Sequence, residues 1–133
     1  MFRSTLFMLA LLPLVSCGGS GSDDYQTAVD QADAKRAEAI SLAPASPCNA
    51  VQQCANLAMV QPQGHCAALD YRPYSLVSPT ADAASAAAAE ERVLAERAVS
   101  LAPPPMTACS ALVVEPPTLG CVANTCQAVA PAN

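Results

Sequence analysis

The sequence predicts an α+β fold: a small disulfide-stapled domain with two Ala-rich helices and short antiparallel hairpins. Two Ala-rich stretches end at prolines, two strand-like runs flank a Gln-Pro-Gln-Gly turn, and six cysteines follow residue 17. The 133 residues are one domain's length. They include 29 alanines, but only 24 large apolar residues (Leu, Val, Ile, Met, Tyr) follow residue 16. We therefore expect disulfides to supply part of the stability that a small core cannot.

Residues 1–16 are predicted to be a lipoprotein signal peptide. Arg3 supplies the positive start, and the apolar run of residues 6–15 is too short to span a membrane, which takes about 20 residues. The segment ends in Leu14-Val15-Ser16-Cys17, which resembles the bacterial lipobox. Cys17 is therefore the predicted lipidation site, carrying palmitate-like acyl chains. The alternative is an ordinary secretory signal that happens to precede a cysteine.

The Gly/Ser run 18–22 has the composition of a flexible tether. We therefore divide the rest of the chain into the lipidated Cys and tether (17–23) and a single disulfide-rich domain (24–130). Two or three acyl chains on one cysteine would anchor the protein permanently to the membrane, because one chain alone binds only marginally. Gly18 after the cysteine favours the outer membrane by the sorting rule of enteric lipoproteins. The expected location is the bacterial cell envelope, facing the periplasm or the surface.

The first helix is predicted over 23–43, ended by Pro44 and Pro47, and the second over 79–102, ended by the run Pro103–Pro105. Helical spacing predicts a weakly apolar face on each helix. The expected buried residues are Tyr25, Val29, Ala32 and Ile40 on the first helix, and Ala86, Ala89, Val93, Leu94 and Leu101 on the second. The charged run Glu90, Glu91, Arg92, Glu96 and Arg97 is expected to be a solvated face.

Two hairpins are predicted. In the first, strands 54–60 and 65–77 are joined by the turn 61–64. In the second, residues 109–114 and 121–126 flank the turn-like stretch 115–120, which would place Cys109 opposite Cys126. A Cys109–Cys126 disulfide is therefore plausible.

Cysteine usage predicts a disulfide framework. Without Cys17, the cysteines are Cys48, Cys54, Cys66, Cys109, Cys121 and Cys126. An even number in a small exported domain indicates disulfides, although six cysteines allow fifteen pairings. No two cysteines have the two-residue spacing of a zinc knuckle or a thioredoxin-like motif. We therefore expect no metal site and no cofactor.

From Cys48 onward the pattern resembles a family of small uncharacterised bacterial lipoproteins. The shared elements are Cys-x5-Cys, a third Cys about a dozen residues later, Tyr-x-x-Tyr-Ser at 71–75, a helix, and a C-terminal Cys trio. The resemblance covers residues 46–128 and implies a fold and a location but no activity. One departure is that Ala67-Ala68-Leu69 stands where the family often has Gly-Gly-Pro.

Composition and motifs limit the function. A net charge of -5 argues against nucleic-acid binding, which needs a basic face. The chain has no nucleophile elbow, metalloprotease helix or phosphate-binding glycine loop. His65 precedes Cys66, but adjacent strand residues point to opposite faces, so we do not expect a Cys-His nucleophile. Tyr71, Arg72 and Tyr74 are the candidate recognition residues, with burial of the tyrosines in the poor core as the alternative.

These observations favour a non-enzymatic interaction module that binds an unknown envelope protein or another envelope component. A second hypothesis is an inhibitor of a periplasmic or foreign hydrolase that uses the loop 61–64 or 115–120. A third is a thiol-redox protein, which would need a free, reactive cysteine in the native state.

Overall fold

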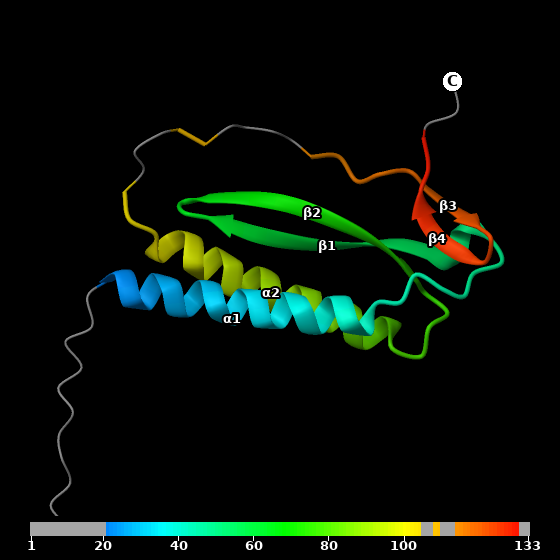
Figure 1. The fold of residues 1–133 in the computed structure, drawn as a ribbon, viewed down its shortest axis with the longest axis horizontal. Helices are drawn as coiled ribbons and strands as arrows, with labels where there is room; N and C mark the ends of the chain where they lie inside the picture. Colours follow the sequence, from blue (N-terminus) through cyan, green and yellow to red (C-terminus); the bar gives the residue numbers. More distant parts are fainter. Residues whose placement is uncertain (1–20, 105–107, 110–113, 131–133) are drawn as a thin grey trace, which may run out of the picture.

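The computed structural model describes residues 21–104, 108–109 and 114–130. It confirms the α+β prediction, with two long helices and two antiparallel hairpins (Figure 1). Three disulfides link the described residues. The predicted signal peptide and lipidation site Cys17 lie outside the described residues. Within the described part of the chain, no helix is both long and apolar enough to cross a bilayer.

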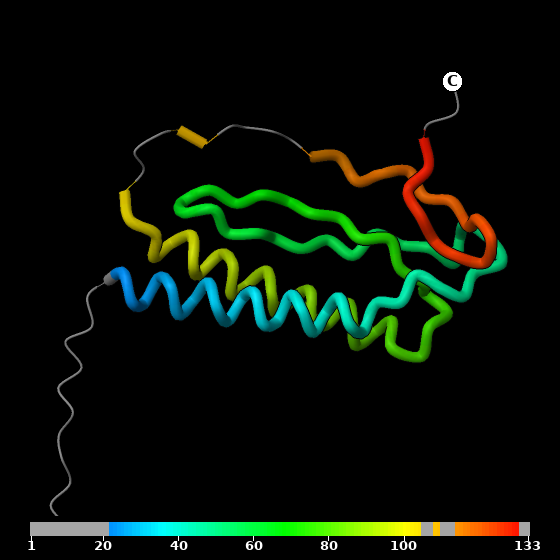
Figure 2. Tube along the Cα trace, in the orientation of Figure 1, coloured from blue at the N-terminus to red at the C-terminus, as the bar shows by residue number. Residues whose placement is uncertain are grey.

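The two helices lie side by side and run in opposite directions (Figure 2). α1 spans Gly21–Leu42 and α2 spans Ala81–Leu101. α1 begins two residues before the predicted start, so residues 21–23, predicted as part of the tether, are helical. Asp23 and Asp24 lie in the first turn of α1, where the positive end of the helix dipole favours carboxylates.

The buried surface of the two helices, which we call the seam and which faces both the other helix and the sheet, consists almost entirely of alanine. The buried residues are Ala28, Ala32, Ala39 and Ala43 on α1, and Ala81, Ala84, Ala87, Ala88, Glu91, Ala95 and Ala98 on α2. On α1, Ala32 is buried as predicted, and Tyr25, Val29 and Ile40 are half-buried. On α2 the predicted face is wrong except for half-buried Leu94: Ala86, Ala89 and Leu101 are exposed, and Val93 is 66% exposed. Small seam residues let the two helices approach closely, so the larger apolar side chains point outward.

The first hairpin consists of β1 (Cys54–Gln63) and β2 (Cys66–Ser75), paired antiparallel from Cys54↔Ser75 to Gln63↔Cys66. Its two-residue turn contains Gly64 at φ 62°, a left-handed conformation that glycine adopts without strain. The predicted strands are confirmed, but β1 continues through most of the predicted turn 61–64. Leu57, Met59 and Tyr74 pack against the helix alanines and form the main core.

The second hairpin consists of β3 (Leu119–Val122) and β4 (Thr125–Ala128). Its turn residues Ala123 and Asn124 have φ angles of 50° and 63°, as a two-residue hairpin turn of type I′ requires. The predicted arms 109–114 and 121–126 are therefore wrong, because the reversal occurs at 123–124 and not within 115–120. Residues 110–113 of the predicted first arm lie outside the described residues.

The disulfides are Cys48–Cys121, Cys54–Cys126 and Cys66–Cys109, with Cα separations of 5.9, 5.5 and 5.6 Å. The predicted Cys109–Cys126 pair is wrong. In the hairpin Cys126 lies opposite Cys121, and each of them bonds to a cysteine near the start of β1. Two bridges thus fasten the second hairpin to the first, and the third ties Cys109 to the turn end of β2.

Candidate functional site

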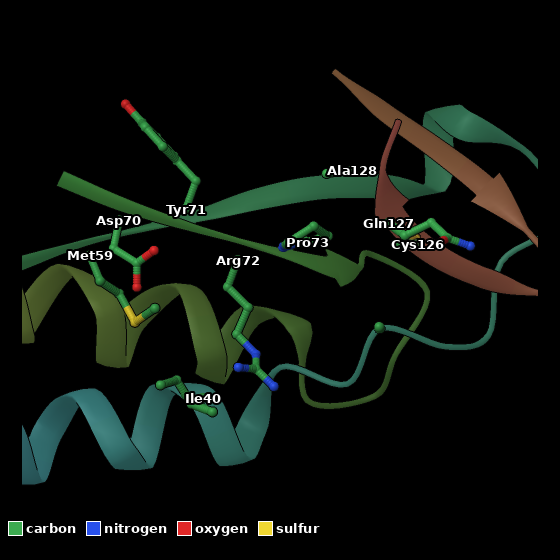
Figure 3. Close-up of a pocket in the computed structure, with 10 residues that line it drawn as sticks. Ile40, Met59, Asp70, Tyr71, Arg72, Pro73, Cys126, Gln127 and Ala128 are labelled. Atoms are coloured by element: carbon green, nitrogen blue, oxygen red, sulfur yellow. The ribbon is translucent and has the colours of Figure 1, made fainter. Parts of the chain in front are cut away.

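An open hollow of about 490 Å³ lies where β2, β4 and the end of α1 meet (Figure 3). Residues 70–73 of β2 form one wall and residues 126–128 of β4 form another. Ile40, Ala45 and Met59 supply the remaining apolar lining. The hollow therefore combines apolar lining with polar side chains of β2 and with Gln127 of β4, which is the usual composition of a recognition site.

The chain segment that follows α1 separates β2 from β4 beside this hollow. The Ser75 N–H donates to the Pro44 carbonyl at 2.9 Å, and the Cys126 N–H donates to the Ala45 carbonyl at 2.7 Å. Because this short segment bonds to both hairpins, it holds the ends of β2 and β4 apart.

The predicted recognition residues Tyr71 and Arg72 both line the hollow. Figure 3 shows Tyr71 pointing away from the helices, whereas Arg72 points toward α1 and Ile40. This divergence follows from the alternation of side chains along a strand. Arg72 is exposed and forms no ion pair with any described residue, so its charge is available to a partner.

The neighbouring acid is already paired. Asp70 accepts from the Arg36 guanidinium, which links β2 to α1. Lys35 bonds to Glu38 and Glu90 at 2.8 and 2.9 Å, and these hydrogen bonds raise the pKa of its ammonium. Among the described basic residues, Arg72, Arg92 and Arg97 have no acidic partner, and of these three only Arg72 lines the hollow.

Tyr74, the third predicted recognition residue, belongs to the core. Only 6% of its surface is exposed, and it packs in the main apolar cluster with Leu57 and Met59. Burial raises the pKa of its phenol, with a smaller contribution from Asp82. Tyr74 therefore does not line the hollow, and the recognition set reduces to Tyr71 and Arg72.

Glu91 is a buried carboxylate that the sequence interpretation placed on a solvated face. It is 0% exposed, and its two oxygens accept from the Val60 N–H at 3.2 and 3.1 Å. Burial raises the pKa of Glu91, although the Val60 hydrogen bond and nearby Arg36 oppose the shift. Its seven-residue spacing from Ala84 and Ala98, both in the seam, was the signal that could have located it.

His65 lies in the turn between β1 and β2, where strand alternation does not apply. Its Nε2 atom is 3.5 Å from the Cys66 Sγ, so the expectation that these side chains diverge is wrong. Two groups bring three potential metal-binding atoms within 4.8 Å of one another: Cys48, Cys54 and Cys126, and His65, Cys66 and Cys109. All of these cysteines are in disulfides, whereas metal binding and nucleophilic attack require a thiolate.

Comparisons with protein-family models, curated proteins and solved structures find no match to this chain. The resemblance to small bacterial lipoproteins therefore stays a prediction. Ala67, Ala68 and Leu69, where the sequence departs from that pattern, are part of β2.

Proposed function

We propose that the chain is a lipid-anchored lipoprotein of the bacterial cell envelope that binds another envelope component through the hollow beside β2. The export signal and lipobox of residues 1–17 support the location, and Gly18 favours the outer membrane. Its role is binding and not catalysis.

The observation that supports the binding role is that Arg72 is exposed and has no ion-pair partner among the described residues. This side chain is exposed at the wall of an open hollow, without a described acidic partner, next to half-buried Tyr71. Arg and Tyr are enriched in protein interfaces because they combine a large contact area with directional hydrogen bonds. The disulfides fix the surrounding strands, and a rigid surface loses less entropy when it binds.

Site-specific photocrosslinking in intact cells tests this role. A photoreactive phenylalanine derivative replaces Tyr71 in the hollow, and a matched control carries it at Val93, which is exposed on α2. We expect a discrete covalent adduct from position 71 alone, which disappears when Arg72→Glu is added. The absence of any adduct, or the same adducts from both positions, would contradict the proposal.

Intact mass of the protein extracted from membranes tests the anchor separately. We expect acyl mass on Cys17, and six further thiols that react with an alkylating reagent only after reduction. The Cys17→Ser variant should leave the membrane fraction. If the native protein carries no lipid, the envelope anchor is wrong. If two or more thiols react before reduction, the thiol-redox hypothesis replaces the binding role.

A further inference from the structure

We infer that the free edge of β2 binds an extended acidic peptide segment of a partner protein, which adds to the sheet as a third strand. The inference rests on the proposed function, because it assigns a partner chemistry to the same hollow. It depends on the direction in which the backbone groups of β2 point.

Three hydrogen-bonding features agree on that direction. The Ser75 N–H donates to the Pro44 carbonyl and the Val60 N–H donates to the Glu91 carboxylate. Neither N–H therefore takes part in the hydrogen bonds between β1 and β2. A two-residue turn makes the flanking pair Gln63↔Cys66 a hydrogen-bonded pair. From this pair onward, hydrogen-bonded and non-hydrogen-bonded pairs alternate along the hairpin. Val60↔Leu69 and Cys54↔Ser75 are therefore both non-hydrogen-bonded pairs, whose N–H and C=O groups point away from the partner strand.

It follows that Leu69 and Tyr71 direct their N–H and C=O groups to the outer edge of β2. No described residue bonds to either N–H. The prolines of the two strands fit the same pattern, since Pro62 and Pro73 occupy outward positions where the ladder needs no N–H.

The two edges of the sheet have different neighbours. β1 packs against α2, whose Glu91 carboxylate accepts from the outward Val60 N–H, and the outward position Pro62 has no N–H, although the outward N–H groups of Asn56 and Ala58 have no described partner. On β2, the Pro44 carbonyl bonds only the last outward N–H, that of Ser75. Among the described residues, only the segment that follows α1 bonds to the outer edge of β2, and none occupies the edge at Leu69–Tyr71, next to the hollow.

The side chains beside this edge define the occupant. Half-buried Ile40 lines the hollow with apolar surface, and Arg72 points into the same side. Asp70 is neutralised by Arg36, so the local charge available to a partner is positive. Because strand side chains alternate, the peptide should carry an acidic residue for Arg72 and an apolar residue two positions away.

A displayed library of random peptides ten residues long, the length of β2, is selected against the full-length protein in detergent. Selected peptides should be enriched in Asp or Glu with an apolar residue two positions away. Leu69→Pro removes the outward N–H and should weaken binding about tenfold. The matched control Leu69→Ala keeps this N–H and should change binding by less than about threefold.

Arg72→Gln should weaken the same peptides about fivefold, whereas Arg97→Gln on α2 should not. Peptide binding should also slow hydrogen exchange at the Leu69 and Tyr71 amides of the wild-type protein, a readout that does not depend on any variant folding. Slow exchange at both amides in the free protein would show that the edge is already filled, and would overturn the inference.

Three other outcomes would also overturn it. One is a library without binders; another is a second copy of the chain on the edge, seen as a dimer that Leu69→Pro dissociates. The third is binding that survives Leu69→Pro but fails in Arg72→Gln. If position 71 still forms its adduct in cells, the proposed binding role stands in each case and only strand addition fails.

Discussion

Two disulfides fasten the hairpins together, and removing one of them should lower the unfolding free energy by less than the length of its loop predicts. Cys48–Cys121 and Cys54–Cys126 close loops with sequence separations of 73 and 72. Because the Cys66–Cys109 bridge closes the middle of both loops, either bridge alone closes a ring of about 30 residues and would stabilise the fold by about 3.6 kcal/mol through the restricted entropy of the unfolded chain. When one of the two bridges is present, however, the other closes a ring of only six residues on one side and five on the other. A ring of that size contributes about 2.8 kcal/mol.

The expected signature is therefore non-additive. Paired Cys→Ala substitution of either bridge should lower the unfolding free energy by about 2.8 kcal/mol, and removal of both should lower it by about 6.4 kcal/mol. The loss from the double removal exceeds the sum of the single losses by about 0.8 kcal/mol, because the last bridge removed closes the longer ring. A loss of about 6 kcal/mol lies within the total stability of small domains, so the variant without both bridges should be largely unfolded.

Urea unfolding monitored by far-ultraviolet circular dichroism measures these free energies. All variants are compared in a Cys17→Ser background, so that no additional thiol can exchange with the bridges. The Cys66–Cys109 bridge lies within both loops, so it is kept intact in every variant. Additive effects of the two bridges, or a smaller loss in the double removal than in either single one, would refute the nested-loop reasoning.

The remaining predictions concern burial and exposure. Because burial raises the folded-state pKa of Glu91, the wild-type protein should lose stability as pH rises above about 4.5, the ordinary value for Glu. Glu91→Gln should flatten this dependence in thermal melts across pH, and an unchanged pH profile would contradict the assignment. Tyr74→Ala should lower the unfolding free energy by about 3 kcal/mol and Tyr71→Ala by less than about 1 kcal/mol in urea titrations; equal losses would place both tyrosines in the core. Under limiting reductant, mass mapping should find alkylation first at Cys66 and Cys109, because Cys109 is exposed, and labelling first at a buried bridge would contradict this order.

Short-range sequence patterns were sufficient to predict most of the helices and strands. Alanine-rich stretches ended by prolines located both helices to within two residues, because helix propensity and proline termination act along the chain. The first hairpin also followed from its flanking strands and glycine turn. The turn at Ala123-Asn124 was missed, because Pro116, Pro117 and Gly120 gave a stronger but misleading turn signal nearby.

The candidate site was only partly predictable. Tyr71 and Arg72 stood out as a Tyr/Arg pair and do line the hollow, but Tyr74 belongs to the core. Its burial depends on the helix alanines that pack against it, which lie far away in the sequence. Glu91 was assigned to solvent because its neighbours Glu90 and Arg92 are charged and exposed, although its heptad position places it in the seam.

The sequence by itself determined the fold class, the presence of a disulfide framework and two of the residues that line the hollow. Composition, proline placement and cysteine parity are properties of the chain that need no knowledge of distant contacts. Only the tertiary structure decided the disulfide pairing, the orientation of the helices and the open edge of β2. A disulfide requires Cα atoms within about 7 Å, a separation set by how the hairpins dock and not by spacing along the chain. The helix faces were likewise fixed by close packing, which selected alanine for the seam and left Val93 in solvent.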